Sequence, residues 1–140
     1  MSYDIRLKNP VTEETILLDN PHLMCGGNFV SGGTREAWLN VTYNYSKWYY
    51  KDGVFPEQNG EKLGIRTIYG MTGAESIPVL KSAIAALRDY CGELSDAEKR
   101  EYEAQGCSGY WLPTKTNATI PLTQLLAFAQ LRPDGVWAGD

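Results

Sequence analysis

Several residue types and patterns that mark particular classes of protein are scarce in this chain of 140 residues. It has one histidine and three cysteines, and no two of the cysteines stand close enough in sequence to form a zinc knuckle. No stretch approaches the roughly 18 apolar residues of a membrane span, and residues 1–6 lack the apolar run of a signal peptide. We therefore expect a cytoplasmic protein with no metal, no cofactor and no membrane partner.

Positive charge is also in short supply. The 13 lysines and arginines oppose 17 aspartates and glutamates, a net charge of −4, so the chain has no overall basic field with which to grip nucleic acid. Six of the acids lie between Asp89 and Glu103, where Lys99 and Arg100 are the only bases. This pattern is typical of a solvated helix face, although such a surface can also meet a basic groove.

What is present fits a single globular domain over residues 1–140. Hydrophobic residues make up 43% of the chain and charged residues 21%, which are ordinary values for a folded domain. A chain of this length buries roughly two thirds of its unfolded surface without help from disulfides or metals. We expect Cys25, Cys91 and Cys107 to be small buried hydrophobic residues.

The N-terminal half reads as strands. Alternation over residues 3–8 predicts a half-buried strand, residues 15–18 a return strand that completes a hairpin, and Asp19-Asn20-Pro21 a turn. The longest alternation runs from Ala37 to Tyr45, and a short helix that Ser46 caps and Gly53 ends is expected next. Residues 64–70 are too short to assign and fit a strand or a helical turn.

The C-terminal half reads as helices. Thr72 with Glu75 and Ser95 with Glu98 have the spacing of a capping box. Pro78 and the similar Thr119-Ile120-Pro121 are expected in first turns, where a missing N–H is harmless. Trp137 is expected to fold back onto the core. The fold class that follows is α+β: an antiparallel sheet from the N-terminal half packed against two or three C-terminal helices.

Two segments are candidate binding sites. Backbone N–H groups of the glycine pairs 26–27 and 32–33 can form an anion-binding nest, and Arg35 can add a charge-assisted bond. We expect Gly32, Gly33 and Arg35 to hold an anionic ligand, unless the loop is a plain hairpin tip. Trp48, Tyr49 and Tyr50 cannot all point inward, so we expect at least one to be exposed and the three to act as contact anchors. Lys47 and Lys51 flank them, which leaves a contact with nucleic acid open.

The residues of catalysis are poorly represented. His22 and Cys25 are three positions apart, but no acid is marked to orient the histidine as a nucleophilic pair requires. No catalytic residue is therefore assigned, and the balance favours a protein that is not an enzyme.

Three strings carry a resemblance: residues 38–46, 64–73 and 132–137, which read WLNVTYNYS, GIRTIYGMTG and RPDGVW. With them the chain resembles a group of small proteins without assigned activity, encoded in phages, prophages and mobile elements of Firmicutes-type bacteria. The resemblance implies an accessory role. Examples are an inhibitor of a host defence nuclease of the anti-CRISPR kind, or a protein that sequesters a nucleotide signal.

The function expected from the sequence is that of a non-enzymatic binding protein that takes a host protein or a small anionic, nucleotide-like ligand. Two alternatives stay open. One is a small enzyme that acts on a nucleotide or nucleic acid through carboxylates brought together by folding. The other is a structural phage protein that forms homo-oligomers.

Overall fold

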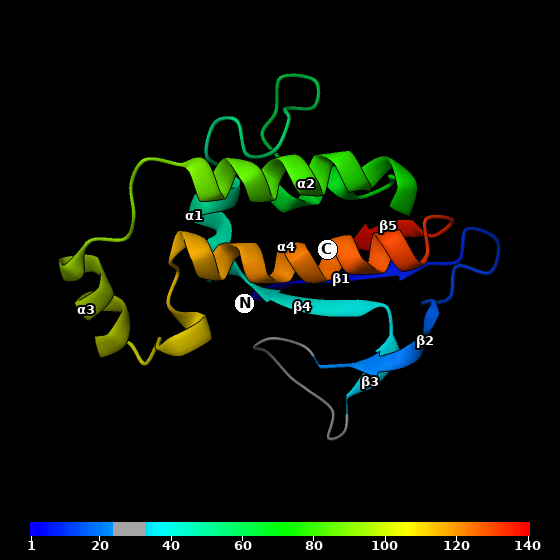
Figure 1. Cartoon of the computed structure of the whole chain (residues 1–140), viewed down its shortest axis with the longest axis horizontal. Helices are drawn as coiled ribbons and strands as arrows, with labels where there is room; N and C mark the ends of the chain where they lie inside the picture. The colour runs from blue at the N-terminus through cyan, green and yellow to red at the C-terminus, as the bar shows by residue number, and fades with distance from the viewer. Residues whose placement is uncertain (24–32) are drawn as a thin grey trace.

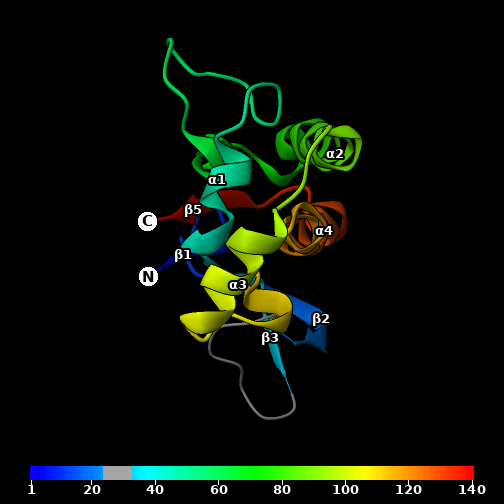
Figure 2. The ribbon, with the colours of Figure 1, turned by 90° about the vertical axis from the view of Figure 1, so that its left-hand side faces the viewer.

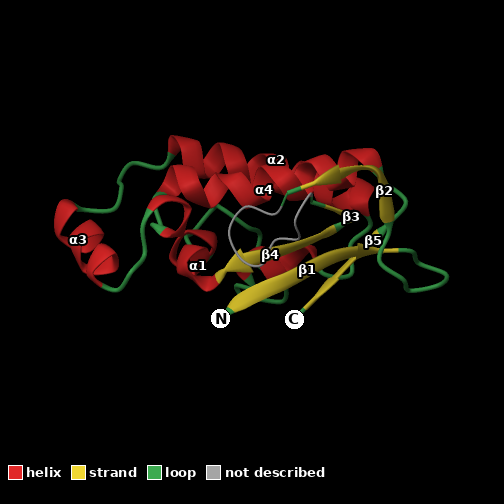
Figure 3. Cartoon of the chain, turned by 90° about the horizontal axis from the view of Figure 1, so that it is seen from below, coloured by secondary structure: helices red, strands yellow, loops and turns green. Residues whose placement is uncertain are grey.

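The computed structural model describes residues 1–23 and 33–140 and has a two-layer α+β architecture (Figure 1). A three-stranded antiparallel sheet has the order β4-β1-β5, and α2 and α4 lie side by side on one of its faces (Figures 2 and 3). The expected fold class is thereby confirmed. The strands are β1 (Ser2–Lys8), β2 (Leu17–His22), β3 (Thr34–Glu36), β4 (Trp38–Thr42) and β5 (Val136–Gly139). The α-helices are α1 (Ser46–Tyr49), α2 (Gly73–Asp89), α3 (Asp96–Ala104) and α4 (Lys115–Leu131), with 3-10 turns at Tyr43–Tyr45, Gly64–Ile68 and Gly109–Trp111.

Strand β1 occupies the centre of the sheet because its alternation gives it one fully apolar side. Tyr3, Ile5 and Leu7 are buried against the helices, whereas Asp4 lies exposed on the other side. The register joins distant parts of the chain, with Ile5 opposite both Leu39 of β4 and Gly139 of β5. The predicted first strand is confirmed, and the C-terminal strand β5 adds an edge that the sequence did not show.

The hairpin expected between residues 3–8 and 15–18 is reduced to a single bridge. Thr15 forms a single bridge with Lys8 before β2 leaves to pair with β3 in a separate two-stranded ribbon. The predicted turn at Asp19-Asn20-Pro21 is wrong, because these residues lie inside β2. Leu17 pairs with Glu36 and His22 with Thr34, so residues 18–21 bulge opposite Arg35 alone. A bulge tolerates the proline and the turn-forming residues that suggested a chain reversal.

The strand predicted from Ala37 to Tyr45 ends early. β4 stops at Thr42, whose hydroxyl accepts a hydrogen bond from the Asn44 N–H at 3.2 Å and starts a 3-10 turn. Helix α1 then ends at Tyr49 rather than at Gly53, and Ser46 is not its cap. The Ser46 hydroxyl instead forms a 2.6 Å hydrogen bond with the hydroxyl of Tyr3 in β1.

Both predicted capping boxes are present, at Thr72 for α2 and at Ser95 for α3. The two prolines were misplaced, since Pro78 and Pro121 lie inside α2 and α4. Helix α4 begins at Lys115, because Thr114 accepts a hydrogen bond from the Asn117 N–H at 3.1 Å. An internal proline costs roughly 3 kcal/mol, and the long packing contact between α2 and α4 offsets that cost.

The core lies between the sheet and the helix pair. Trp137 of β5 is buried there as expected, and its Nε1 donates a 2.7 Å hydrogen bond to the Ser76 hydroxyl of α2. Cys91 is exposed and Cys107 partly exposed, which corrects the expectation of buried thiols, and Cys25 lies outside the described residues. In the described part of the chain, no helix has both the length and the apolar character to span a bilayer.

Candidate functional site

Strand β2 lies along the C-terminal half of α4. The Leu23 carbonyl accepts a 2.7 Å hydrogen bond from Nε2 of Gln124, and the His22 ring meets the Phe128 ring edge-on at 4.7 Å. Further along, β2 and the end of α4 together line a pocket. The strand therefore runs antiparallel to the helix. We call this surface the β2–α4 face and define it by Leu17, Asp19, Leu23, Leu131 and Arg132.

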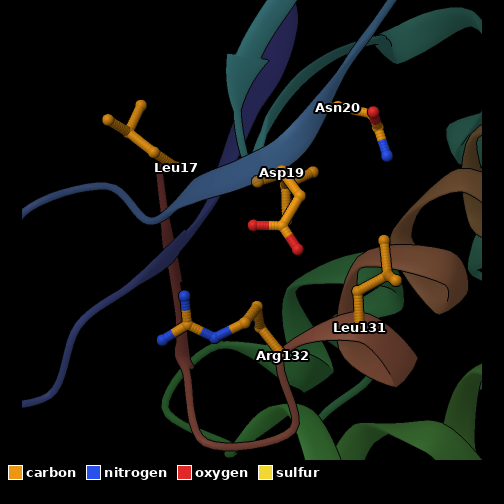
Figure 4. Close-up of a pocket in the computed structure, with 6 residues that line it drawn as sticks. Leu17, Asp19, Asn20, Leu131 and Arg132 are labelled. Carbon is orange, nitrogen blue, oxygen red and sulfur yellow. The ribbon is translucent and has the colours of Figure 1, made fainter.

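The pocket has a volume of about 130 Å³ (Figure 4) and is lined by Leu17, Leu18, Asp19, Asn20, Leu131 and Arg132. Figure 4 shows Leu131 pointing toward β2 and the Asp19 carboxylate pointing toward Arg132, whereas Leu17 projects away from the helix end. The side chains of Leu17, Leu23 and Leu131 are 57%, 60% and 66% exposed. Large apolar side chains left in water beside a pocket are typical of an interaction site.

Arg132 places a cation at this pocket, and the carboxylate of Asp134 already neutralises its charge. Its Nε and Nη2 donate hydrogen bonds of 2.9 and 2.8 Å to the two carboxylate oxygens of Asp134. This bidentate bond raises the pKa of Arg132, with a smaller contribution from Asp19, and lowers the pKa of Asp134. Asp134 thus holds the Arg132 guanidinium in one orientation and occupies the Nε and Nη2 donors on that side of the group.

Asp19 is the unpaired charge of the face. Among the described residues its carboxylate has no ion pair and no hydrogen bond, although it lies close enough to Arg132 to affect its pKa. Arg132 and Leu17 also line a neighbouring hollow of about 300 Å³ that contains Glu14. Three carboxylates, those of Glu14, Asp19 and Asp134, thus lie near one guanidinium, and the other cation close by is Arg35, whose Nε is bonded to the Leu18 carbonyl of the pocket wall.

The predicted aromatic anchors lie mostly in the core. Trp48 and Tyr49 are buried, with Trp48 Nε1 donating to the Pro113 carbonyl at 2.7 Å and the Tyr49 hydroxyl donating to the Ala118 carbonyl at 2.8 Å. Both polar atoms therefore find partners inside the protein, and neither ring is exposed to contact a partner protein. Tyr50 is 36% exposed. The expectation that at least one of the three is exposed is met by Tyr50 alone.

The predicted anion site is only partly described. Gly32 and the pair 26–27 lie outside the described residues. Gly33 has a φ of +83°, and a Cβ there would come within 2.7 Å of the His22 carbonyl oxygen. Arg35 turns its Nε to the Leu18 carbonyl at 2.7 Å and so supports the bulge of β2 that forms the pocket wall. Gly33 and Arg35 thus both lie against the backbone of β2, and Arg35 is exposed.

The sequence reasoning missed Leu131 and Arg132 as site residues. A weak signal was available, since Leu131 falls outside the apolar stripe formed by Leu122, Leu125 and Ala129. Leu17 likewise stands on the opposite side of its strand from the buried Ile16 and Leu18. Single exposed apolar residues are common on protein surfaces, and they indicate an interaction site only when folding brings several of them together.

A second pocket of about 340 Å³ lies between residues 53–56 and the first half of α2. Its lining is largely apolar and includes Phe55, whose ring packs edge-on against Tyr49 at 6.0 Å. Of the aromatic run, Tyr49 thus contacts a residue of the pocket wall without lining the pocket itself. Within residues 1–23 and 33–140, no group of three or more histidines, cysteines or acids is arranged to hold a metal ion.

Comparison with protein-family models, with curated proteins and with solved structures gives no match for this chain. The geometry of the site itself must therefore indicate the function. Its main elements are the exposed leucines, the pocket beside them and the arrangement of charge around Arg132.

Proposed function

We propose that this chain is a non-enzymatic binding protein of phage or mobile-element origin that attaches to a host protein through the β2–α4 face. The observation that carries the proposal is a pocket with a charged rim that the exposed Leu17 and Leu131 line, with a third exposed leucine, Leu23, further along the same face. The origin follows from the resemblance of the three sequence strings, and the mode of action follows from the surface.

The pocket offers little to support catalysis. Its lining consists of leucines, Asp19, Asn20 and Arg132, so it contains no hydroxyl, thiol or amine nucleophile. The donors of Arg132 that point to Asp134 are occupied, which leaves that side of the guanidinium unable to hold a substrate oxyanion. A role in binding a partner protein accounts for the leucines and charged residues of the pocket and requires no nucleophile.

The surface has the anatomy of a protein interface rather than of a deep ligand site. The pocket is small, about 130 Å³, and two of the side chains that line it, Leu17 and Leu131, are more than half exposed. Specific interfaces combine an apolar centre with a polar rim, and truncation of a few central residues removes most of the binding energy. We assign the apolar contribution to Leu131 and Leu17 and the rim to Asp19 and Arg132.

The experiment is affinity capture from a Firmicutes-type host lysate with four tagged proteins: the wild type, the double variant Leu17→Ser/Leu131→Ser, and the single variants Gln130→Ser and Tyr50→Ser. We expect one host protein to be retained by the wild type and by Gln130→Ser, an exposed neighbour on the same helix. The double variant is expected to lose it, with a dissociation constant at least tenfold weaker for the purified pair. Both leucines are exposed, so the fold should tolerate the change.

Tyr50→Ser separates the two surfaces that the chain offers. Loss of the same host protein from this variant, with full retention by the leucine double variant, would place the interface on the aromatic segment instead. Equal retention by all four proteins, with unchanged affinity, would contradict the proposal.

A further inference from the structure

We infer that the side chain which the partner inserts beside Leu131 is basic, a lysine or an arginine whose cation reaches the Asp19 carboxylate. The inference rests on the proposed function and names the chemistry that the same face recognises. The charge of the bound group is then positive, whereas the glycine loop and Arg35 suggested an anionic ligand.

The charges around the pocket favour a cation. Arg132 would attract an anion if it were free, but its Nε and Nη2 are held by Asp134 at 2.9 and 2.8 Å. Asp19 lies on the facing strand and has no ion pair within the described residues. Glu14 adds a further negative charge in the adjoining hollow. A positively charged group complements this surface, whereas an anionic group would meet two unpaired carboxylates.

The second argument is shape. Leu131 is 66% exposed and points toward β2, so it offers an apolar wall at the open side of the pocket (Figure 4). The Asp19 carboxylate projects into the same space from the strand (Figure 4). Lysine and arginine have an apolar stem and a charged end, and such side chains pack the stem on apolar surface while the end stays hydrated or paired. Leu131 can contact the apolar stem of such a side chain while the Asp19 carboxylate pairs with its charged end.

The third argument is the fixed position of the acid. Asp19 lies in the bulge of β2 between the pairs Leu17–Glu36 and His22–Thr34. Arg35 holds the Leu18 carbonyl at 2.7 Å, so the backbone immediately before Asp19 is anchored from β3. Leu17 and Asp19 are both exposed and Leu18 between them is buried, so residues 17–19 keep the alternation of a strand. Figure 4 shows the Asp19 carboxylate turned toward the end of α4.

The test is a titration with small probes, followed through the ¹³C methyl resonances of Leu17 and Leu131. The probes are N-acetyl-lysine amide, N-acetyl-norleucine amide, which has the stem without the cation, and N-acetyl-glutamate amide. We expect millimolar binding of the lysine probe, at least about fivefold tighter than the norleucine probe, and the weakest binding for glutamate. The preference for lysine should shrink as salt is raised, because the site is exposed.

Asp19→Asn keeps the size of the side chain and removes its charge. It should abolish the preference for lysine over norleucine and leave norleucine binding unchanged. Asp134→Asn is the matched second variant, because it releases the Arg132 guanidinium into the face and should also lower lysine affinity. Equal affinities for lysine and norleucine in the wild type, tighter binding of glutamate, or no methyl shift with any probe would each overturn the inference.

Failure of this inference is distinguishable from failure of the proposed function. If Leu17→Ser/Leu131→Ser loses the host protein while Asp19→Asn retains it with full affinity, the face binds a partner but does not read a basic side chain. If both variants retain the partner with full affinity, the face is not the interface and both proposals are wrong. Loss with both variants, with Gln130→Ser unaffected, is the result expected.

Discussion

Helices α2 and α3 start in the same way and end up in opposite situations. Each has a capping box, Thr72 with Glu75 in α2 and Ser95 with Glu98 in α3. Helix α2 packs along α4, and its buried residues are Gly73, Ser76, Leu80, Ala83, Ile84 and Leu87. Helix α3 has no buried residue and lies at the end of the molecule, away from the sheet (Figure 1). Local signals therefore decide where a helix begins, and packing decides how firmly it is held.

The length of the two helices strengthens this contrast. Helices shorter than about 12–15 residues are marginal in water without tertiary contacts. Helix α3 has 9 residues. An ion pair between Glu98 and Lys47 joins it to the rest of the protein, with Oε2 of Glu98 3.1 Å from Nζ of Lys47. Helix α2 has 17 residues and an apolar face in the core. We expect α2 to unfold with the whole protein and α3 to open by itself.

The largest effect should come from removing core volume in α2. Leu80 is fully buried, so Leu80→Ala should lower the free energy of unfolding by about 2–5 kcal/mol. The matched change in α3 is Tyr102→Ala, which touches a partly exposed side chain and should stay within about 0.5 kcal/mol. Urea unfolding followed by circular dichroism measures both. Similar losses for the two variants would show that α3 belongs to the cooperative core.

A smaller effect should follow from removing the caps. Thr72→Ala leaves the Glu75 N–H without its 3.1 Å partner and should lower the free energy of unfolding by about 1 kcal/mol. Ser95→Ala breaks the equivalent 3.1 Å bond to the Glu98 N–H. Because α3 is expected to open independently, this variant should speed amide exchange across residues 96–104 and leave global stability unchanged. A global loss equal to that of Thr72→Ala would contradict the comparison.

The capping boxes show how much of this fold the sequence could predict. Caps are local, and both were identified from residues three positions apart. The positions of Pro78 and Pro121 were not, because the first-turn rule treats a proline as a boundary and ignores the packing of α2 on α4 that outweighs it. Which members of the aromatic run are buried could not be predicted for a related reason: the polar atoms of Trp48 and Tyr49 bond to the carbonyls of Pro113 and Ala118, far away in sequence.

The residues of the candidate site were harder to predict from the sequence than the helix caps. Leu131 and Arg132 become site residues only because β2 folds against the end of α4, which brings residues 17–20 beside them. The irregular pairing of β2 with β3 depends on a register between distant residues, and residues 19–21 resemble a turn when read alone. Arg35 is expected from the sequence to bind an anion, and the structure places its Nε on the Leu18 carbonyl, a contact that depends on the pairing of β2 with β3.

The smallest effect concerns the ion pair that ties α3 to the body. Hydrogen bonding to Lys47 lowers the pKa of Glu98 below its usual value of 4.5, with further help from Ser95. A carboxyl whose pKa is depressed in the folded state contributes its stability above the ordinary pKa and loses it as the pH falls through the depressed value. We therefore expect the amide exchange of α3, relative to α2, to be independent of pH above 4.5 and to rise below it.

Two variants isolate the Lys47 contribution to this pH dependence. Lys47→Met removes the partner and should shrink the pH-dependent change, while the contribution of Ser95 remains. Glu98→Gln should remove the dependence on this residue altogether. Added salt should act in the same direction as Lys47→Met, since both groups are partly exposed and screening weakens such pairs. Equal pH dependence in α2 and α3, with or without Lys47, would mean that the two helices open together and that the division between them is wrong.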